Sequence, residues 1–219
     1  MLKLDSYDVV IFDCDGVILD SNELKITAMK LALEAYSDNQ QAIARSVEYF
    51  RANFGKSRYH HIAAFAEQFF ELTGAESAQF EARILNDYAQ SCEQLYLQAS
   101  LTPAIDELLE KLNGKKLYVA SGSDQDELRR VFARRKLHQH FVEILGSPTQ
   151  KKDNVRQIIE ENGNSQTLMI GDAVSDFSAA AENGIDFLFY SPFSNVKDKM
   201  LEMSKEHDFP VINHFSELL

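Results

Sequence analysis

The chain has 219 residues, 45% of them hydrophobic, which is enough for one core or for one core with a small accessory unit. Lys and Arg number 22 and Asp and Glu number 34, so the net charge is −12, which argues against non-specific binding to nucleic acid or to an anionic membrane. The chain has only two cysteines, no apolar run near the ~20 residues that a membrane span needs, and no signal-peptide pattern. These features predict a cytoplasmic protein, which we expect to be a monomer by default.

The predicted elements begin with a short buried strand at residues 9–12, Val-Val-Ile-Phe, which are apolar and mostly β-branched. From about Asn22 to about Ala99 the sequence has helical character almost throughout. Gly55 and Gly74 interrupt this stretch, so we expect about four helices. The apolar face of the first of these helices is predicted to consist of Leu24, Ala28, Leu31 and Ala35.

After Leu101, predicted helices and strands alternate. Thr102 and Pro103 fit the start of a helix that Asn113 and Gly114 end. Further helices are predicted at residues 124–136, 153–162 and 173–183. Strands are predicted at residues 117–120, 141–145, 167–170 and 187–190, with a weak edge strand near 209–212 that contains Pro210. Such alternation predicts an α/β protein with a parallel, Rossmann-like sheet.

The order of the segments predicts how the chain is divided. The first strand precedes the helical segment and the remaining strands come after it, so the helical segment is an insertion into one sheet domain. We therefore predict a Rossmann-like core formed by residues 1–20 and 100–219. An all-helical cap of residues 21–99 would be inserted into that core.

Polar side chains follow four of the predicted strands. Open α/β sheets bind ligands beyond the carboxyl ends of their strands, so we expect these side chains to meet at one edge of the sheet. In chain order they are Asp13-Cys14-Asp15-Gly16, then Ser121-Gly122-Ser123, then Lys151 and Lys152, then Gly171-Asp172 and Asp176.

Physical chemistry narrows the use of such a cluster. Crowded carboxylates repel one another and would repel an anionic substrate, and a hard divalent cation resolves both problems. Ligands that are all oxygen suit Mg²⁺. Ser121 and the free amides at the start of the following helix form an anion site, to which a lysine adds a positive charge. Together these groups predict a Mg²⁺-dependent phosphoryl site.

The same residues resemble the four motifs of the haloacid dehalogenase superfamily, in their order and across the whole chain. The motifs are Asp13-Cys14-Asp15-Gly16-Val17, Ser121, Lys151 or Lys152, and Gly171-Asp172-x-x-x-Asp176. A helical insertion soon after the first motif is similar to the cap of the phosphoglycolate phosphatase and β-phosphoglucomutase group. One D-x-D-G motif would be a weak signal, but four motifs in order, each at the end of a strand, are a strong one.

The resemblance implies a role for each aspartate. Asp13 would be the nucleophile that becomes an aspartyl phosphate. Asp15 would be the general acid and base, and its backbone carbonyl would bind the metal. Asp172 would bind Mg²⁺, and Asp176 would be a further ligand or an orienting group. The dehalogenase branch lacks an acid at the position of Asp15 and the phosphonatase branch has a small residue there, so the resemblance favours phosphate esters.

The resemblance also implies a phosphate-binding set made of Ser121, Gly122 and one lysine. The family often shows a Gly-Lys-Pro pattern, whereas this chain has Gly146-Ser-Pro-Thr-Gln followed by two lysines. We favour Lys151, because it lies just before the predicted helix. Lys152 would then be a solvated neighbour.

Other reactive residue types have simpler interpretations. Cys14 would need an arginine six residues later to act as a phosphatase cysteine, and Asp20 stands there, so we expect Cys14 to be buried packing. The histidines lack convincing metal partners and are expected at the surface or in packing. These are His60, His61, His138 and His140. The basic helix that begins after Asp124 is expected to be a solvated face.

Two cations in the helical segment are candidates for contacting a substrate. Lys56 and Arg58 follow Gly55, and a glycine-led loop between helices of the insertion could reach over the site. There the two cations would grip the distal group of a substrate. The alternative is a solvated turn.

These observations predict a hydrolase that cleaves the phosphate ester of a small phosphorylated metabolite, of the sugar phosphate or phosphoglycolate type. One alternative is a phosphomutase with the same site, which nothing in the sequence distinguishes. The other is a non-catalytic protein that binds a partner through its cap, and the complete aspartate set weighs against it. Neither nucleic acid nor a membrane is an expected partner.

Overall fold

The computed structural model describes residues 3–163 and 165–219, which are built around a parallel sheet. Its strands lie in the order β3-β2-β1-β4-β5-β6. They are β1 (Val9–Phe12), β2 (Lys116–Asp124), β3 (Glu143–Ser147), β4 (Thr167–Gly171), β5 (Asp186–Tyr190) and β6 (Val211–Ile212). Phe12 lies opposite Val119 on β2 and Ile170 on β4, so β1 and β4 end at about the same level while β2 extends beyond them to Asp124. The predicted α/β class with a Rossmann-like parallel sheet is confirmed.

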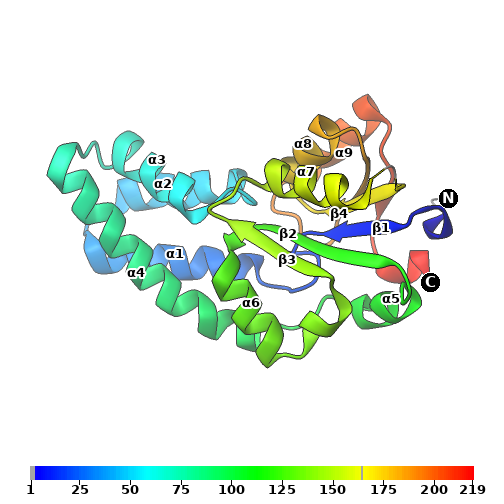
Figure 1. Cartoon of the computed structure of the whole chain (residues 1–219). Helices are drawn as coiled ribbons and strands as arrows, with labels where there is room; N and C mark the ends of the chain where they lie inside the picture. Colours follow the sequence, from blue (N-terminus) through cyan, green and yellow to red (C-terminus); the bar gives the residue numbers. More distant parts are fainter. Residues whose placement is uncertain (1–2, 164) are drawn as a thin grey trace.

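Helices cover both faces of the sheet (Figure 1). One face carries α5 (Ile105–Lys111) and α6 (Gln125–Arg134), and the other carries α7 (Lys151–Asn162), α8 (Val174–Glu182) and α9 (Lys197–His207). Successive side chains of β1 point to opposite faces: Val10 and Phe12 pack with residues of α5 and α6, whereas Val9 and Ile11 pack with residues of α7, α8 and α9. Short 3₁₀ helices occur at Leu4–Ser6, Leu137–His140 and Phe215–Leu218.

Four further helices lie beyond the carboxyl ends of the strands (Figure 1). This helical unit consists of α1 (Asn22–Tyr36), α2 (Gln40–Ala52), α3 (Arg58–Gln68) and α4 (Gly74–Gln98). The chain enters and leaves it side by side, because the amide of Asp20 donates to the carbonyl of Ser100 at 2.9 Å. The unit is thus an insertion between β1 and α5. No described helix is both long and apolar enough to cross a membrane.

Of the predicted apolar face of α1 only Ala28 is buried, so the predicted face is wrong. Leu24 and Leu31 are 37% and 58% exposed, and the buried face instead carries Ile26, Met29 and Leu33. Apolar residues occur on several sides of this helix, so the sequence pattern does not select one face. The buried face also contains two polar side chains near the N-terminus of α1, Asn22 and Lys25, which contact the candidate active site described below.

Two helix starts also differ from the prediction. Helix α5 begins at Ile105, after Ala104 in a left-handed conformation, because the hydroxyl of Thr102 donates to the carbonyl of Val17 and does not cap the helix. Helix α7 begins at Lys151, two residues earlier than predicted. Helix α9 has no counterpart among the predicted elements, because its sequence is mostly charged and among its residues Met200 is the buried one.

Candidate active site

Three buried carboxylates meet where β1 and β4 end. Asp13, Asp172 and Asp176 each offer an oxygen, and these atoms lie within 4.8 Å of one another. The amide of Asp13 donates to the carbonyl of Ile170 at 2.9 Å, which places the ends of the two strands side by side. One oxygen of Asp176 accepts from the amides of Asp172 and Ala173, at 3.0 and 2.9 Å. This contact needs the preceding Gly171, because a Cβ there would lie 2.3 Å from the Cβ of Asp176.

Of the two candidate lysines, the structure brings Lys151 to the carboxylates. Its ammonium lies 3.1 Å from Oδ1 of Asp13 and also pairs with Asp176. Lys151 is the first residue of α7 and is buried. Lys152 points away and pairs with Glu182 at 3.2 Å on the neighbouring helix.

One ammonium does not balance three buried carboxylates. Burial raises the pKa of Asp13 to about 7, and the charge of Asp176 adds to this shift while Lys151 opposes it. Burial, and then the charges of Asp176 and Asp13, raise the pKa of Asp172 well above its usual value. Oδ2 of Asp13 and Oδ1 of Asp172 are buried without a hydrogen-bond partner. Two unpartnered carboxylate oxygens in an anionic cluster fit a hard divalent cation.

The first residue of the helical unit contacts this cluster. The side-chain amide of Asn22 donates to Oδ2 of Asp172 at 2.8 Å and to the carbonyl of Phe193 at 2.9 Å. Gly16 lies beneath this contact with φ of +74°, and a Cβ there would lie 2.3 Å from Oδ2 of Asp172. The glycine of the first motif therefore lets α1 approach the carboxylates closely.

Asp15 lies outside the carboxylate cluster, in a network of its own. Its carboxylate accepts from the hydroxyl of Ser21 at 2.6 Å, from the ammonium of Lys25 at 2.8 Å and from the hydroxyl of Ser123 at 2.9 Å. The hydroxyl of Tyr96 lies 2.9 and 3.0 Å from its two oxygens. Burial raises the pKa of Asp15, but the charge and hydrogen bond of Lys25, helped by Ser21 and Tyr96, outweigh burial and hold this pKa below its usual value.

Sequence reasoning missed Lys25, Tyr96 and Ser123. A weak signal exists for Lys25, because it lies one helical turn after Asn22 on the face of α1 that turns inward. Tyr96 lies on α4, 81 residues from Asp15, and no local pattern connects the two. Ser123 lies in the predicted strand-end segment, but the motif pattern assigns it no role.

The last residues of β2, which extends four residues beyond its predicted end at Ala120, lie against the helical unit. Ser121 is fully buried, and its hydroxyl accepts from the amide of Ser123 at 3.2 Å. A Cβ on Gly122 would lie 2.2 Å from the carbonyl oxygen of Gly55. Gly55 in turn lies so close to Ser175 that its own Cβ would come within 2.1 Å of that hydroxyl. The segment between α2 and α3 therefore lies directly on Ser121 and Gly122, the end of β2 that is predicted to bind phosphate.

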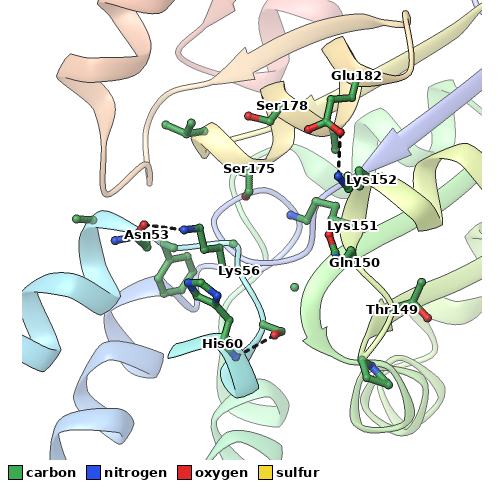
Figure 2. A pocket seen from close by; sticks show the side chains of 18 of the residues that line it. Asn53, Lys56, His60, Thr149, Gln150, Lys151, Lys152, Ser175, Ser178 and Glu182 are labelled. Carbon is green, nitrogen blue, oxygen red and sulfur yellow. Dashed lines mark hydrogen bonds and ion pairs between the residues drawn. The ribbon is translucent and has the colours of Figure 1, made fainter. Parts of the chain in front are cut away.

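A cleft of about 710 Å³ opens between the helical unit and the sheet domain. Figure 2 shows Lys151 and Ser175 facing it from one side, and Lys56 and His60 from the other. Gly122 also lines it. Lys151, which contacts the carboxylates, and Lys56, which belongs to the helical unit, therefore line the same cavity.

The amino-acid sequence matches a family model over residues 7–184, and that model describes haloacid dehalogenase-like hydrolases. The chain belongs to this family. The resemblance predicted from the four motifs is thus confirmed. No protein of curated function matches the sequence significantly.

Solved structures share the fold of this haloacid dehalogenase-like hydrolase at low sequence identity. A predicted phosphoglycolate phosphatase from Haemophilus somnus is 17% identical, with a TM-score of 0.77 over 98% of this chain and 97% of its own. A predicted phosphatase from Clostridium acetobutylicum is 19% identical, with a TM-score of 0.73 over 97% and 96%. The magnesium-bound hydrolase YfnB from Bacillus subtilis, described as showing interdomain movement, is 18% identical, with a TM-score of 0.61 over 85% and 89%.

The two cations predicted to contact the substrate of this hydrolase lie in different places. Lys56 is exposed and lines the cleft, and its ammonium donates to the side chain of Asn53 at 3.0 Å. Arg58 is buried and pairs with both carboxylate oxygens of Glu127 on α6, at 3.1 and 2.9 Å. Its guanidinium also lies over the ring of Tyr88. Arg58 does not line the cleft, so its predicted role in gripping a substrate does not fit and Lys56 alone remains a candidate.

The remaining reactive residues of the hydrolase are mostly structural. Cys14 is a fully buried free thiol, as expected. His60 is exposed and contacts the hydroxyl of Tyr49 at 3.0 Å. Several arginines of α6 form ion pairs with glutamates, which fits a solvated face. His61 differs from these groups, because it is fully buried and packs edge-on against the ring of Phe50.

Proposed function

We propose that this hydrolase is a Mg²⁺-dependent phosphatase that cleaves the phosphate ester of a small phosphorylated metabolite. The observation that carries the proposal is the buried trio of Asp13, Asp172 and Asp176 with Lys151 in contact with Asp13. The cleft beside Lys151 has room for a metabolite of modest size, and further lysines line it. The phosphatase descriptions of structural relatives agree with this proposal.

Asp13 and Asp172 would hold the cation through their unpartnered oxygens, together with the backbone carbonyl of Asp15. Both oxygens of Asp176 are already engaged, one by Lys151 and the other by two backbone amides. This favours an orienting role for Asp176 over a role as ligand. When bound, Mg²⁺ would offset the charge of the carboxylates and polarise the phosphoryl group.

Asp13 would attack the phosphorus atom and form an aspartyl phosphate as the ester P–O bond breaks. Its Oδ1 is held by the amide of Cys14 at 2.7 Å and by Lys151, which fixes the direction of the carboxylate. The leaving oxygen would take a proton from Asp15. A water molecule would then lose a proton to Asp15 and attack the phosphorus, which releases phosphate and restores Asp13. Because Lys25 holds the pKa of Asp15 low, Asp15 would have to part from Lys25 and take up a proton from solvent before it could donate to the leaving oxygen.

Residues 21–99 would serve as a cap over this chemistry. The contact between Gly55 and Gly122 and the ion pair between Arg58 and Glu127 hold the helical unit on the sheet domain. A closed cap excludes water from the reacting groups. Substrate would enter when the two regions separate at the side-by-side segments near Asp20 and Ser100.

We expect EDTA to abolish the release of p-nitrophenol from p-nitrophenyl phosphate and Mg²⁺ to restore it. Without a cation, the buried carboxylates repel the phosphate. Ca²⁺ should not restore activity, because its looser and higher coordination disturbs the attacking geometry. Asp172→Asn should lose the Mg²⁺ response, whereas Asp198→Asn, at an exposed position on α9, should keep it. Full activity in chelator would contradict the proposal.

The thermal stability of the chelated protein should fall as pH rises from about 5 to about 7.5, between the unfolded and the folded pKa of Asp13. An unfolded Asp has a pKa near ~4, so raised folded pKa values mean that the folded state binds more protons than the unfolded state, and this stability is lost as Asp13 and Asp172 ionise. Mg²⁺ should therefore raise Tm more at pH 8 than at pH 5. Calorimetry measures both effects, and a Mg²⁺ response independent of pH would contradict the charge repulsion.

A further inference from the structure

The helical unit supplies a side chain that contacts one carboxylate of the proposed metal site. Asn22 is the first residue of α1 and is 2% exposed, and its side-chain amide donates to Oδ2 of Asp172 at 2.8 Å. Asp172 is itself 1% exposed. A hydrogen bond to an ionised acceptor in so buried a place is stronger than a bond between neutral groups at the surface. The contact therefore holds the carboxylate of Asp172 in one orientation.

The two proposed ligand carboxylates are held in the same manner. Oδ1 of Asp13 is bonded by the amide of Cys14 and by Lys151, and Oδ2 of Asp172 is bonded by Asn22. The other oxygen of each carboxylate is buried without a partner in the part of the chain that the structure describes. In each group an internal donor fixes one oxygen and leaves the second for the cation. The donors differ in origin, because Cys14 and Lys151 belong to the sheet domain and Asn22 belongs to the helical unit.

The amide of Asn22 also ties α1 to the loop that follows β5. It donates a second hydrogen bond to the carbonyl of Phe193 at 2.9 Å. The hydroxyl of Ser194, the next residue of that loop, donates to the carbonyl of Asp172 at 2.5 Å. One side chain of the helical unit thus contacts both Asp172 and the loop that holds the backbone of Asp172. Both acceptors lie in the sheet domain, so the two bonds depend on where the helical unit lies.

The place of Asn22 beside the proposed hinge decides how these bonds respond to opening of the cap. The amide of Asp20 donates to the carbonyl of Ser100 at the point where the chain enters and leaves the helical unit. Asn22 lies just beyond this pair, on the side of the cap. If the two regions separate at Asp20 and Ser100, Asn22 moves with α1 and its bonds to the sheet domain break. Asp172 would then lose the donor that orients its carboxylate.

We propose that Asn22 is a positioning residue for the metal site, and that the cation is bound most tightly when the cap is seated on the sheet domain. This inference rests on the proposed Mg²⁺-dependent function. Loss of a group that hydrogen-bonds a metal ligand typically weakens metal binding by about 10- to 100-fold. Coupling between two sites is reciprocal, so a seated cap that raises the affinity for Mg²⁺ is held in place by Mg²⁺ to the same extent. The protein without its cation would therefore open more readily than the protein that holds it.

The first test measures the Kd for Mg²⁺ from the rise of Tm with Mg²⁺ concentration. Asn22→Leu keeps about the size of the side chain but has no donor, so its Kd should be at least about tenfold higher than that of the wild type. Asn22→Ala should show the same increase, which separates loss of the donor from a change of volume. Asn162→Ala is the matched control. It removes an amide that bonds Tyr118 and Ile158 at the far end of α7, and it should keep the wild-type Kd.

The same titration separates positioning from a purely structural role. It gives the Tm of each variant without Mg²⁺ as well as the response to Mg²⁺. A lower Tm in chelator together with an unchanged Kd would mean that Asn22 only supports the fold, and this would overturn the proposal.

Amide hydrogen exchange tests the reciprocal effect of Mg²⁺ on the cap. Gly122 and Ser123 are covered by the segment at Gly55 of the helical unit, so exchange of their amides reports separation of the two regions. Saturating Mg²⁺ should slow this exchange in the wild type by a factor close to the change in Kd. In Asn22→Leu the slowing should be nearly absent. Equal slowing in both proteins, or none in the wild type, would contradict the coupling.

Binding of Mg²⁺ by the wild type distinguishes this inference from the proposed function. If the wild type binds no Mg²⁺ and responds as Asp172→Asn does, the metal-dependent phosphatase function itself is removed. If the wild type binds Mg²⁺, Asp172→Asn does not, and Asn22→Leu binds it with the wild-type Kd, the role of Asn22 alone is overturned.

Discussion

Replacement of Asp13 by asparagine is expected to abolish phosphatase activity with every substrate and to prevent formation of a phosphoenzyme. The amide keeps the shape of the side chain but is not a nucleophile, and it cannot form the acyl phosphate. Mass spectrometry of acid-quenched protein should show a phosphate adduct in the wild type and none in Asp13→Asn. Asp8→Asn, at the exposed residue before β1, is the matched control and should behave as wild type.

Two results would contradict this assignment. One is turnover by freshly purified Asp13→Asn above the rate measured without enzyme. The other is an adduct on a different residue in the wild type. Asp13→Asn should also be more stable than the chelated wild type at pH 8, because it removes one of three mutually repelling carboxylates.

Replacement of Asp15 by asparagine is expected to separate the two halves of the reaction. Alkyl phosphates have poor leaving groups and need a proton from Asp15, so the variant should not hydrolyse them. Nitrophenol leaves with little protonation, so Asp13 should still take the phosphate from p-nitrophenyl phosphate. The second half should then stall, because no base activates water. Stopped-flow absorbance should show a burst of about one equivalent of nitrophenol per enzyme, followed by slow turnover.

The buried network around Asp15 requires a control for stability. Asparagine at this position leaves the ammonium of Lys25 without its 2.8 Å partner, and breaking one half of a buried ion pair costs about 3–5 kcal/mol. The double variant Asp15→Asn, Lys25→Met removes both charges and should recover much of the lost Tm. It should show the same burst. Turnover of alkyl phosphates at the wild-type rate by either variant would exclude Asp15 as the general acid and base.

The amino-acid sequence is sufficient to predict the sheet and the residues at its edge. Apolar runs such as residues 9–12 identify the strands, and the parallel order of the strands brings their carboxyl ends to one edge of the sheet. Asp13, Asp172 and Lys151 could therefore be placed together from the sequence alone. The choice of Lys151 over Lys152 depends on where α7 begins, and Lys151 contacts the carboxylates although the helix starts earlier than predicted.

The contacts of the helical unit cannot be predicted in the same way. They depend on how four helices lie on the sheet domain, and no local pattern encodes that placement. The sequence presents Arg58 as a free cation because Glu127, its partner, is 69 residues away. The roles of Lys25 and Tyr96 are hidden for the same reason, since each meets Asp15 across the boundary between the two regions.

The buried ion pair of Arg58 and Glu127 bears on how fast product can leave. In the proposed opening of the cap, water would reach both groups and replace the bonds that they make to each other. A buried ion pair adds little net stability for this reason, whereas exposed apolar surface carries a cost in proportion to its area. This one ion pair can therefore align α3 with α6 in a single register while it would add little to the cost of the proposed separation.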